Sequence, residues 1–111
     1  MGGSIARARG AAAYRRAAQA GTIPRNTVAP AITGTAQVGQ TLTVTNGTWA
    51  GNSATYARQW RANGVNIGGA TATTYVPVSG DVGKVITCVV TATNSTGSAS
   101  ATSNASAAVA A

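Results

Sequence analysis

Apolar and polar residues alternate in several short stretches after residue 30, and glycine, asparagine or proline separates one stretch from the next. In residues 40–45, polar positions separate Leu42 from Val44, and residues 55–62 carry Trp60 in a similar alternation. Successive side chains of a strand point to opposite faces of its sheet, so this period predicts half-buried β-strands. The predicted strands cover residues 31–36, 40–45, 55–62, 65–68, 73–78, 85–93 and 98–109.

Turn-forming dipeptides lie between these strands. Asn63-Gly64 separates two of them, and an Asn-Gly pair in that position predicts a β-hairpin because both residues adopt positive φ readily. Asn46-Gly47 marks a further turn. Seven short strands separated by turns are typical of an antiparallel β-sandwich, so the sequence predicts an all-β sandwich for residues 30–111.

The beginning of the chain has a different composition from the rest. Residues 4–20 are rich in Ala and Arg and lie between a serine that can cap a helix and a glycine that can end it, so they predict a short helix. Residues 21–29 contain one proline and precede another, and they predict an extended linker. We therefore expect two parts: a basic arm over residues 1–29 and a β-sandwich domain over residues 30–111.

Most of the positive charge lies in this arm. The chain carries eight Lys and Arg residues against one acid, for a formal charge of +7, and five of the arginines precede residue 30. Arginine forks form paired hydrogen bonds with carboxylates, so we expect the arm to bind an acidic protein surface. The residues expected to contact this partner are Arg7, Arg9, Tyr14, Arg15, Arg16 and Arg25.

Nucleic acid is the competing partner for a basic segment, because phosphate also attracts arginine. The arm offers only Tyr14 for stacking on bases, and residues 30–111 add three further cations. Specific nucleic-acid binding is therefore the weaker hypothesis. A membrane is not expected as a partner either, because the predicted helix has no continuous apolar stripe and no apolar run reaches the roughly 20 residues that cross a bilayer.

The composition excludes most enzyme chemistry. Asp81 is the only acid, histidine is absent, and Cys88 is the only cysteine. Paired carboxylates, a Ser-His-Asp or Cys-His set and a histidine-based metal site are ruled out, so we expect no catalytic residue, cofactor or metal. Asp81 is expected to accept hydrogen bonds from its own turn. Arginines interrupt every stretch that would serve as an export signal, so we expect synthesis in a cytoplasm.

Few large residues are available for a core. The chain has 25 alanines, one leucine and no phenylalanine, while 17 threonines and 11 valines favour strands. The predicted core is built around Leu42, Trp60, Tyr75 and Cys88. Trp49 follows a turn, where packing at a strand end is favoured over the alternative of a platform that stacks on carbohydrate.

A longer set of residues resembles a known domain family. Trp60 in the third strand, followed by Asp81-x-Gly83 before the strand with Cys88, is similar to immunoglobulin-like domains. The whole pattern resembles the Ig-like module of bacterial surface proteins and bacteriophage virion proteins, and it covers about residues 30–109. Its other elements are Pro30-x-Ile32-x-Gly34, Val38-Gly39-Gln40-x-Leu42, Gly47-Thr48-Trp49, Gln59-Trp60, Asn63-Gly64, Ile67-x-Gly69-Ala70, Thr74-Tyr75, the Lys84 that follows Gly83, and Ala92-x-Asn94-x-x-Gly97.

The sequence departs from antibody-type domains at two places. Leu42 and Val44 occupy the strand where a partner for Cys88 would lie, so we expect the thiol to stay free and to pack as a small apolar group. Val85 stands where a tyrosine usually forms a corner after the Asp-x-Gly turn, so the hydrogen bond of that corner is missing.

One Ig-like domain behind a short basic arm resembles the small accessory proteins of tailed-phage virions, such as capsid decoration or cement proteins. The resemblance implies a non-enzymatic structural protein that is made in the host cytoplasm and becomes part of the virion. It implies other virion proteins as partners, above all the major capsid protein, and self-association on a lattice. Two alternatives stay open, because one fold serves many functions. The first is a surface-binding module for host attachment, which would contact glycan or protein through loops near Trp49, residues 68–72 and residues 95–97. The second is a basic nucleic-acid-associated protein.

Overall fold

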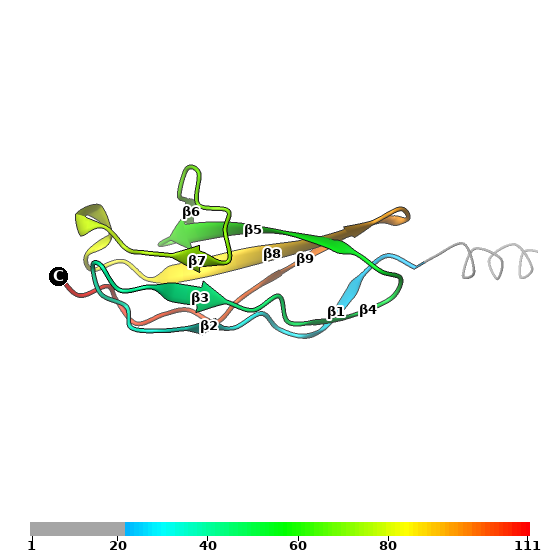
Figure 1. Ribbon diagram of the computed structural model, residues 1–111, viewed down its shortest axis with the longest axis horizontal. Coiled ribbons are helices and arrows are strands. Elements are labelled where there is room, and N and C mark those ends of the chain that lie inside the picture. The colour runs from blue at the N-terminus through cyan, green and yellow to red at the C-terminus, as the bar shows by residue number, and fades with distance from the viewer. Residues whose placement is uncertain (1–21) are drawn as a thin grey trace, which may run out of the picture.

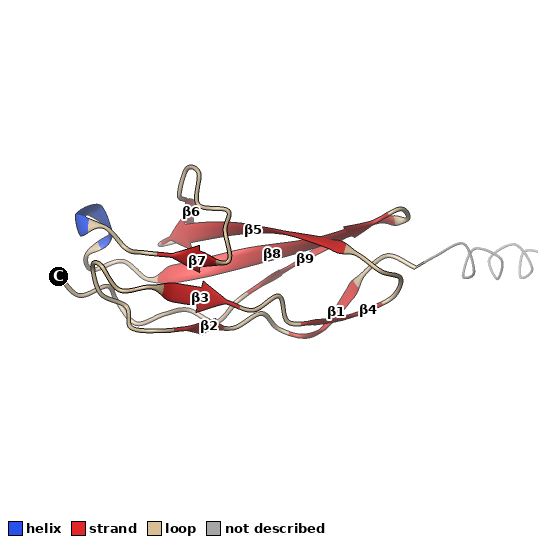
Figure 2. Cartoon of the chain, viewed as in Figure 1, coloured by secondary structure: helices blue, strands red, loops and turns tan. Residues whose placement is uncertain are grey.

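A computed structural model describes residues 22–111 and shows that this part of the chain is all-β (Figure 1). Its strands form antiparallel sheets, and the only helix of the described residues is the short 3-10 helix η1 at Ser79–Asp81 (Figure 2). The predicted helix over residues 4–20 lies outside the described residues, as do Arg7, Arg9, Tyr14, Arg15 and Arg16.

The largest sheet has four strands in the order β6-β5-β8-β9. Its centre is the long pair of β5 and β8, whose register runs from Thr55 opposite Thr93 to Ala62 opposite Ile86. The hairpin predicted at Asn63-Gly64 joins β5 to β6, and Asn63 has the positive φ of 48° that such a turn requires. The bounds are Thr55–Ala62 for β5, Val65–Asn66 for β6, Ile86–Asn94 for β8 and Gly97–Thr102 for β9.

The second sheet has three short strands in the order β2-β3-β7, with bounds Ile32–Thr33, Leu42–Val44 and Thr74–Tyr75. One apolar cluster joins it to the four-stranded sheet. Leu42 and Val44 contribute from β3, and Trp60 and Cys88 contribute from β5 and β8, where they lie opposite each other in register. Every second residue of β8 from Ile86 to Ala92 is buried, so the period of two in the sequence is the period of burial in the fold.

The remaining two strands, β1 (Arg25–Val28) and β4 (Thr48–Ala50), form a separate antiparallel pair. The sequence predicts an extended linker over residues 21–29, and four of these residues form the strand β1, whose partner strand the sequence does not indicate. This strand has no buried residue, so it leaves no apolar alternation in the sequence, and its partner residues lie 20 to 25 positions away. The Asn26 side chain reinforces the pair by donating hydrogen bonds to the carbonyl oxygens of Val28 (2.8 Å) and Thr48 (3.1 Å).

The last predicted strand, residues 98–109, is regular only up to Thr102. Beyond Thr102, two serine hydroxyls stand in for backbone carbonyl oxygens as acceptors: Ser103 Oγ accepts from the Cys88 N–H, and Ser106 Oγ accepts from the Ile86 N–H. Competition of this kind between side chain and backbone interrupts regular pairing. The chain then returns to the domain through single bridges of Ala108 to Val85, Val109 to Val82 and Ala110 to Gln37.

Gly47 and Gly64 allow a matched test of how tightly β1 is seated. Both have φ near +80°, but a Cβ at Gly47 would overlap the carbonyl oxygen of Val28, whereas a Cβ at Gly64 would meet no atom within 4 Å. Each alanine carries the left-handed penalty of about 1–2 kcal/mol. We expect Gly47→Ala to lower the free energy of unfolding clearly more than Gly64→Ala, as measured by urea denaturation. Equal losses would show that β1 yields to the added methyl group.

Candidate functional site

The end of the domain at which the described chain begins combines several features of a binding surface. Thr22, the first described residue, lies here together with the β4–β5 loop and the β8–β9 turn, while Ala111 lies at the opposite end (Figure 1). We call this region the arm-proximal end. Its residues are Thr22, Ile23, Arg25, Asn46, Trp49, Asn52, Tyr56, Arg58 and Asn94.

Two asparagines hold Thr22 in place. Asn52 Oδ1 accepts hydrogen bonds from the Thr22 backbone N–H (2.8 Å) and from its hydroxyl (3.1 Å). Asn94 Nδ2 donates to the Thr22 carbonyl oxygen (2.7 Å), and its own Oδ1 accepts from the backbone N–H groups of Thr96 and Gly97. The second set of bonds orients the Asn94 amide so that its donor faces Thr22. We refer to Asn52 and Asn94 as the asparagine clamp, and it fixes the point where the chain joins the domain.

Ile23 is seated against two glycines. Its side chain would overlap a Cβ built at Gly97, and its carbonyl oxygen would lie 2.9 Å from a Cβ built at Gly51. Both neighbours must therefore lack a side chain for Ile23 to lie this close. Ile23 itself keeps 49% of its surface exposed, so this end of the domain presents an apolar side chain next to the clamp.

Trp49 and Tyr56 form an aromatic pair beside the clamp, with ring centroids 6.3 Å apart. Trp49 is half-buried against the core, and its indole N–H donates to the Asn46 carbonyl oxygen (2.7 Å). Arg58 donates from Nη1 to Asn46 Oδ1 (3.0 Å), while its buried Nε has no hydrogen-bond partner. One side of Trp49 packs against the core, as the sequence favours, whereas Tyr56 remains exposed.

The charges at the arm-proximal end are all positive. Arg25 is exposed on β1, opposite Ala50, and the partly buried Arg58 lies on β5, where it bonds to Asn46. Asp81, the only carboxylate side chain in the sequence, belongs to η1 at the other end of the domain. No acidic side chain therefore offsets the arginines here, and an acidic partner would be attracted to this end.

At the other end of the domain, Asp81 is buried, and one of its two carboxylate oxygens accepts hydrogen bonds. Its Oδ2 accepts from the Tyr75 hydroxyl and from the Val78 N–H (3.1 Å). The second bond is the contact within its own turn that the sequence predicts. The first was not foreseen: the Tyr75 hydroxyl bonds to this turn although Val85 occupies the usual tyrosine position. The spacing of six residues between Tyr75 and Asp81 carries no signal that would have revealed it.

Tyr75 also contacts the core, where its ring stacks on that of Trp60 with centroids 5.8 Å apart. Burial, followed by the hydrogen bond to Asp81 and the charge of that carboxylate, raises the pKa of Tyr75 to about 12. Burial also raises the pKa of the Cys88 thiol, which is free and fully enclosed. Of the other predicted core residues, Leu42 and Trp60 are fully buried.

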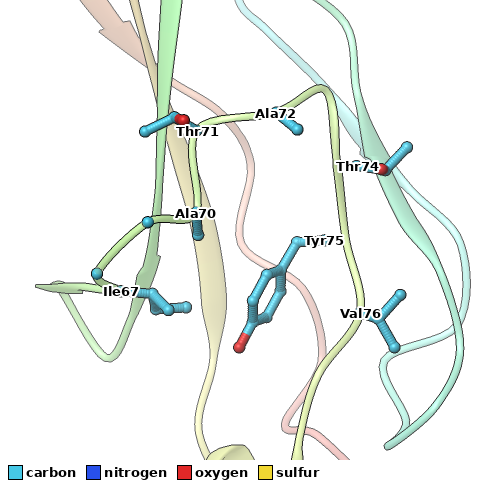
Figure 3. Close-up of a pocket in the computed structure, with 9 residues that line it drawn as sticks. Ile67, Ala70, Thr71, Ala72, Thr74, Tyr75 and Val76 are labelled. Carbon is cyan, nitrogen blue, oxygen red and sulfur yellow. The ribbon is translucent and has the colours of Figure 1, made fainter.

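Two pockets flank the β6–β7 region. The first, of about 290 Å³, is lined by residues 67–72 and by β7 with its neighbours, and Figure 3 shows the Tyr75 ring between the loop and Val76. The second, of about 400 Å³, is bounded by the β5–β6 hairpin, Asp81 and Lys84. Within residues 22–111, no group of three or more His, Cys, Asp or Glu side chains is placed to hold a metal ion. The first pocket offers apolar side chains and hydroxyl groups, and the second adds two amides and one charge of each sign.

Comparisons of the chain with protein-family models, with curated proteins and with solved structures give no match. Over residues 22–111, the structure contains no helix with the length and apolar character needed to cross a membrane.

The asparagine clamp can be tested by proteolysis. The bond after Arg25 lies in paired β1, so trypsin should cut it only when this segment opens. We expect the double variant Asn52→Ala/Asn94→Ala to be cut after Arg25 on the order of tenfold faster than the wild type, because the bonds to Thr22 are lost. Mass spectrometry of the fragments gives the rate. Asn66→Ala is the control, and an equal rate in all three proteins would contradict a role for the clamp.

The Tyr75–Asp81 contact predicts a pH dependence of stability. A tyrosine of the unfolded chain titrates near 10, and the folded protein holds the Tyr75 proton up to about 12. The folded state therefore binds more protons between these values, so the free energy of unfolding falls as the pH rises through this range. Urea denaturation at about pH 9 and about pH 11.5 measures the fall. Tyr75→Phe should reduce it and Tyr56→Phe should not, whereas equal falls in both variants would contradict the assignment.

Proposed function

We propose that this chain is a structural protein of a bacteriophage virion, a capsid decoration protein that is anchored by its basic arm and exposes an Ig-like domain. It acts without catalysis. The observation that carries the proposal is the attachment of the chain at the arm-proximal end. Residues 22–28 are held by the asparagine clamp and by the β1–β4 pair, so a partner that grips the arm also fixes the orientation of the domain.

The proposed Ig-like sandwich consists of the three-stranded and the four-stranded sheet, with β2, β3 and β5 to β9 as its seven strands. The strand orders β2-β3-β7 and β6-β5-β8-β9 support it, because Ig-like domains place their first, second and fifth strands in one sheet and their third, sixth and seventh in the other. The shared core and the register of Trp60 opposite Cys88 support it as well.

Charge separation supports an acidic partner for the arm. Five arginines precede residue 30, and one of them, Arg25, lies exposed at the arm-proximal end. The buried Asp81 lies at the far end and does not neutralise them. Arginine binds carboxylates through two parallel hydrogen bonds, so the proposed contact is with acidic residues of another virion protein, above all the major capsid protein.

Many copies bind one particle, so a weak contact made by each copy is enough to reinforce the shell. Each arm bound to a symmetric shell holds its domain close to the neighbouring subunits, and a second contact of the same copy then forms at high effective concentration. A protein that binds the assembled shell but not its free subunits shifts the assembly equilibrium toward the shell. A modest contribution from each copy therefore reinforces the particle.

The arm is tested by cosedimentation with particles that lack this protein. The structure sets the truncation: removal of residues 1–21 leaves β1 and the clamp intact, whereas removal of residues 1–29 would also delete a strand. We expect the full chain to pellet with the particles and the chain without residues 1–21 to stay in solution, since the arm supplies the acidic-surface contact. Circular dichroism checks that the shortened chain retains its sheets.

A full-length variant with Arg7, Arg9, Arg15 and Arg16 changed to alanine separates charge from length and should also fail to pellet. Retained pelleting of both proteins would contradict the anchor. If the full chain binds naked DNA with a steep salt dependence and ignores the particle, the nucleic-acid alternative is favoured. Binding to host cells that persists without the arm would favour the surface-binding alternative.

A further inference from the structure

The guanidinium of Arg58 is a partly buried positive charge without a counterion among the described residues. Its Nε is enclosed and has no hydrogen-bond partner, and its Nη1 donates to Asn46 Oδ1 (3.0 Å), which belongs to a neutral amide. The N–H groups of Nη2 meet no acceptor within residues 22–111. A guanidinium carries five N–H donors and no acceptor, so a single bond to a neutral group leaves most of its capacity unused.

Arg61 on the same strand provides a comparison. Side chains three positions apart on a strand point to opposite faces of the sheet, and Arg61 Nε donates to Asn66 Oδ1 (2.8 Å) across the β5–β6 hairpin. The equivalent nitrogen of Arg58 is enclosed and unpaired. An enclosed donor without a partner costs free energy, and a neutral partner on Nη1 leaves the charge uncompensated. A negative group bound at Nη2 supplies that compensation.

The chain itself supplies no carboxylate side chain for this position. Asp81 is the only acidic side chain in the sequence, residues 1–21 included. It is buried in η1 at the opposite end of the domain, where the Tyr75 hydroxyl and the Val78 N–H bond to it (Figure 1). A second copy carries the same side chains, so it offers no exposed acidic side chain either. The charge at Arg58 therefore selects a different molecule, one with acidic groups on its surface.

Two aromatic rings are linked to this charge through Asn46. The Asn46 carbonyl oxygen accepts from the indole N–H of Trp49 (2.7 Å), while its side chain accepts from Arg58, so one residue fixes both. The ring of Trp49 lies 6.3 Å from that of Tyr56 between centroids, and Tyr56 is exposed. Tryptophan, tyrosine and arginine are the residues that contribute most binding energy at protein interfaces. We call Asn46, Trp49, Tyr56 and Arg58 the Arg58 site.

We propose that the Arg58 site binds a carboxylate, the side chain of an aspartate or glutamate on another protein. Arg58 Nη2 donates to the carboxylate, and the rings of Trp49 and Tyr56 contact the apolar stem of the acidic residue. Asn46 holds Arg58 and Trp49 before binding, so little side-chain freedom is lost when the ligand arrives. The carboxylate chemistry follows from the site itself, whereas its owner, the acidic surface of the virion partner, rests on the proposed function. The contact adds to that of the arm and orients the domain on that surface.

Phosphate is the other anion that arginine binds, and nucleic acid is the source from which it would come. A protein that follows a phosphate backbone neutralises several phosphates with separate cations. The Arg58 site contains one cation, and its other members are neutral. A single carboxylate beside aromatic rings fits this composition better, so phosphate is an outcome of the test.

Two indole N–H signals in the NMR spectrum of the full chain test the site. Trp49 and Trp60 are the only tryptophans, and the Trp60 indole is buried and donates to the Ala72 carbonyl oxygen (2.8 Å). We expect N-acetylglutamate methylamide, which carries one side-chain carboxylate, to shift the Trp49 signal with a dissociation constant in the millimolar range and to leave Trp60 unmoved. The neutral N-acetylglutamine methylamide should shift neither signal. No shift of Trp49, an equal shift by the neutral compound, or a stronger shift by inorganic phosphate would overturn the proposal.

Matched arginine variants assign the shift to Arg58. Arg58→Gln removes the charge and should abolish the Trp49 shift, whereas Arg61→Gln removes a charge from the other face of β5 and should retain it. Arg58→Lys keeps the charge without the planar fork, and we expect it to bind about threefold more weakly. A Trp49 shift that persists in Arg58→Gln overturns the proposal. The Trp60 signal reports folding, and if Arg58→Gln disturbs it, Arg58→Lys decides, because binding equal to that of the wild type then overturns the proposal.

Cosedimentation with particles that lack this protein tests the owner of the carboxylate. For the full chain, Arg58→Gln should raise the concentration at half saturation on the order of tenfold without abolishing binding, because the arm still binds. Arg61→Gln should bind as the wild type does. Equal binding of all three proteins would overturn the second contact and leave the arm anchor standing. If no protein pellets, the proposed function fails, and the Trp49 shift still decides whether the site binds a carboxylate.

Discussion

The burial of Trp60 is the constraint on which the rest of the domain depends. Its side chain is fully enclosed between strands of the two larger sheets, and its indole N–H donates to the Ala72 carbonyl oxygen (2.8 Å). Its backbone bonds to Ile67 and Ala70 hold the same loop. One residue thus joins β5, the β6–β7 loop and the core. In a chain with one leucine and no phenylalanine, few other residues are large enough to fill this position.

The contacts of Trp60 continue through Tyr75 to the far end of the domain. Tyr75 stacks on the indole and bonds to Asp81, and Asp81 in turn holds the backbone of its turn. A buried carboxylate needs such donors, because an unpaired one would carry a large desolvation cost. The single acid of the chain is therefore used inside the domain, which leaves its surface positive. Structure and net charge are linked at this residue.

Local patterns predict the regular parts of this fold and miss its long-range polar contacts. Strand β5 has the predicted bounds of residues 55–62, because apolar alternation and an Asn-Gly turn coincide there. Strand β1 was missed because all of its residues are at least partly exposed, so its pairing with β4 leaves no trace in hydropathy. The asparagine clamp was missed for a related reason. Asparagine is common in turns, and only the folded chain brings Asn52 and Asn94 to Thr22.

The bridge between residues 36–38 and 108–110 determines how the domain would carry load. These segments run parallel, joined by bonds from the Val38 N–H to the Ala110 carbonyl oxygen and from the Ala110 N–H to that of Ala36, both 2.9 Å. A pull between Thr22 and Ala111, which lie at opposite ends in Figure 1, draws the two segments past each other. Both bonds are then sheared together instead of being peeled apart one at a time. The domain is therefore built to resist tension along its length better than tension across it.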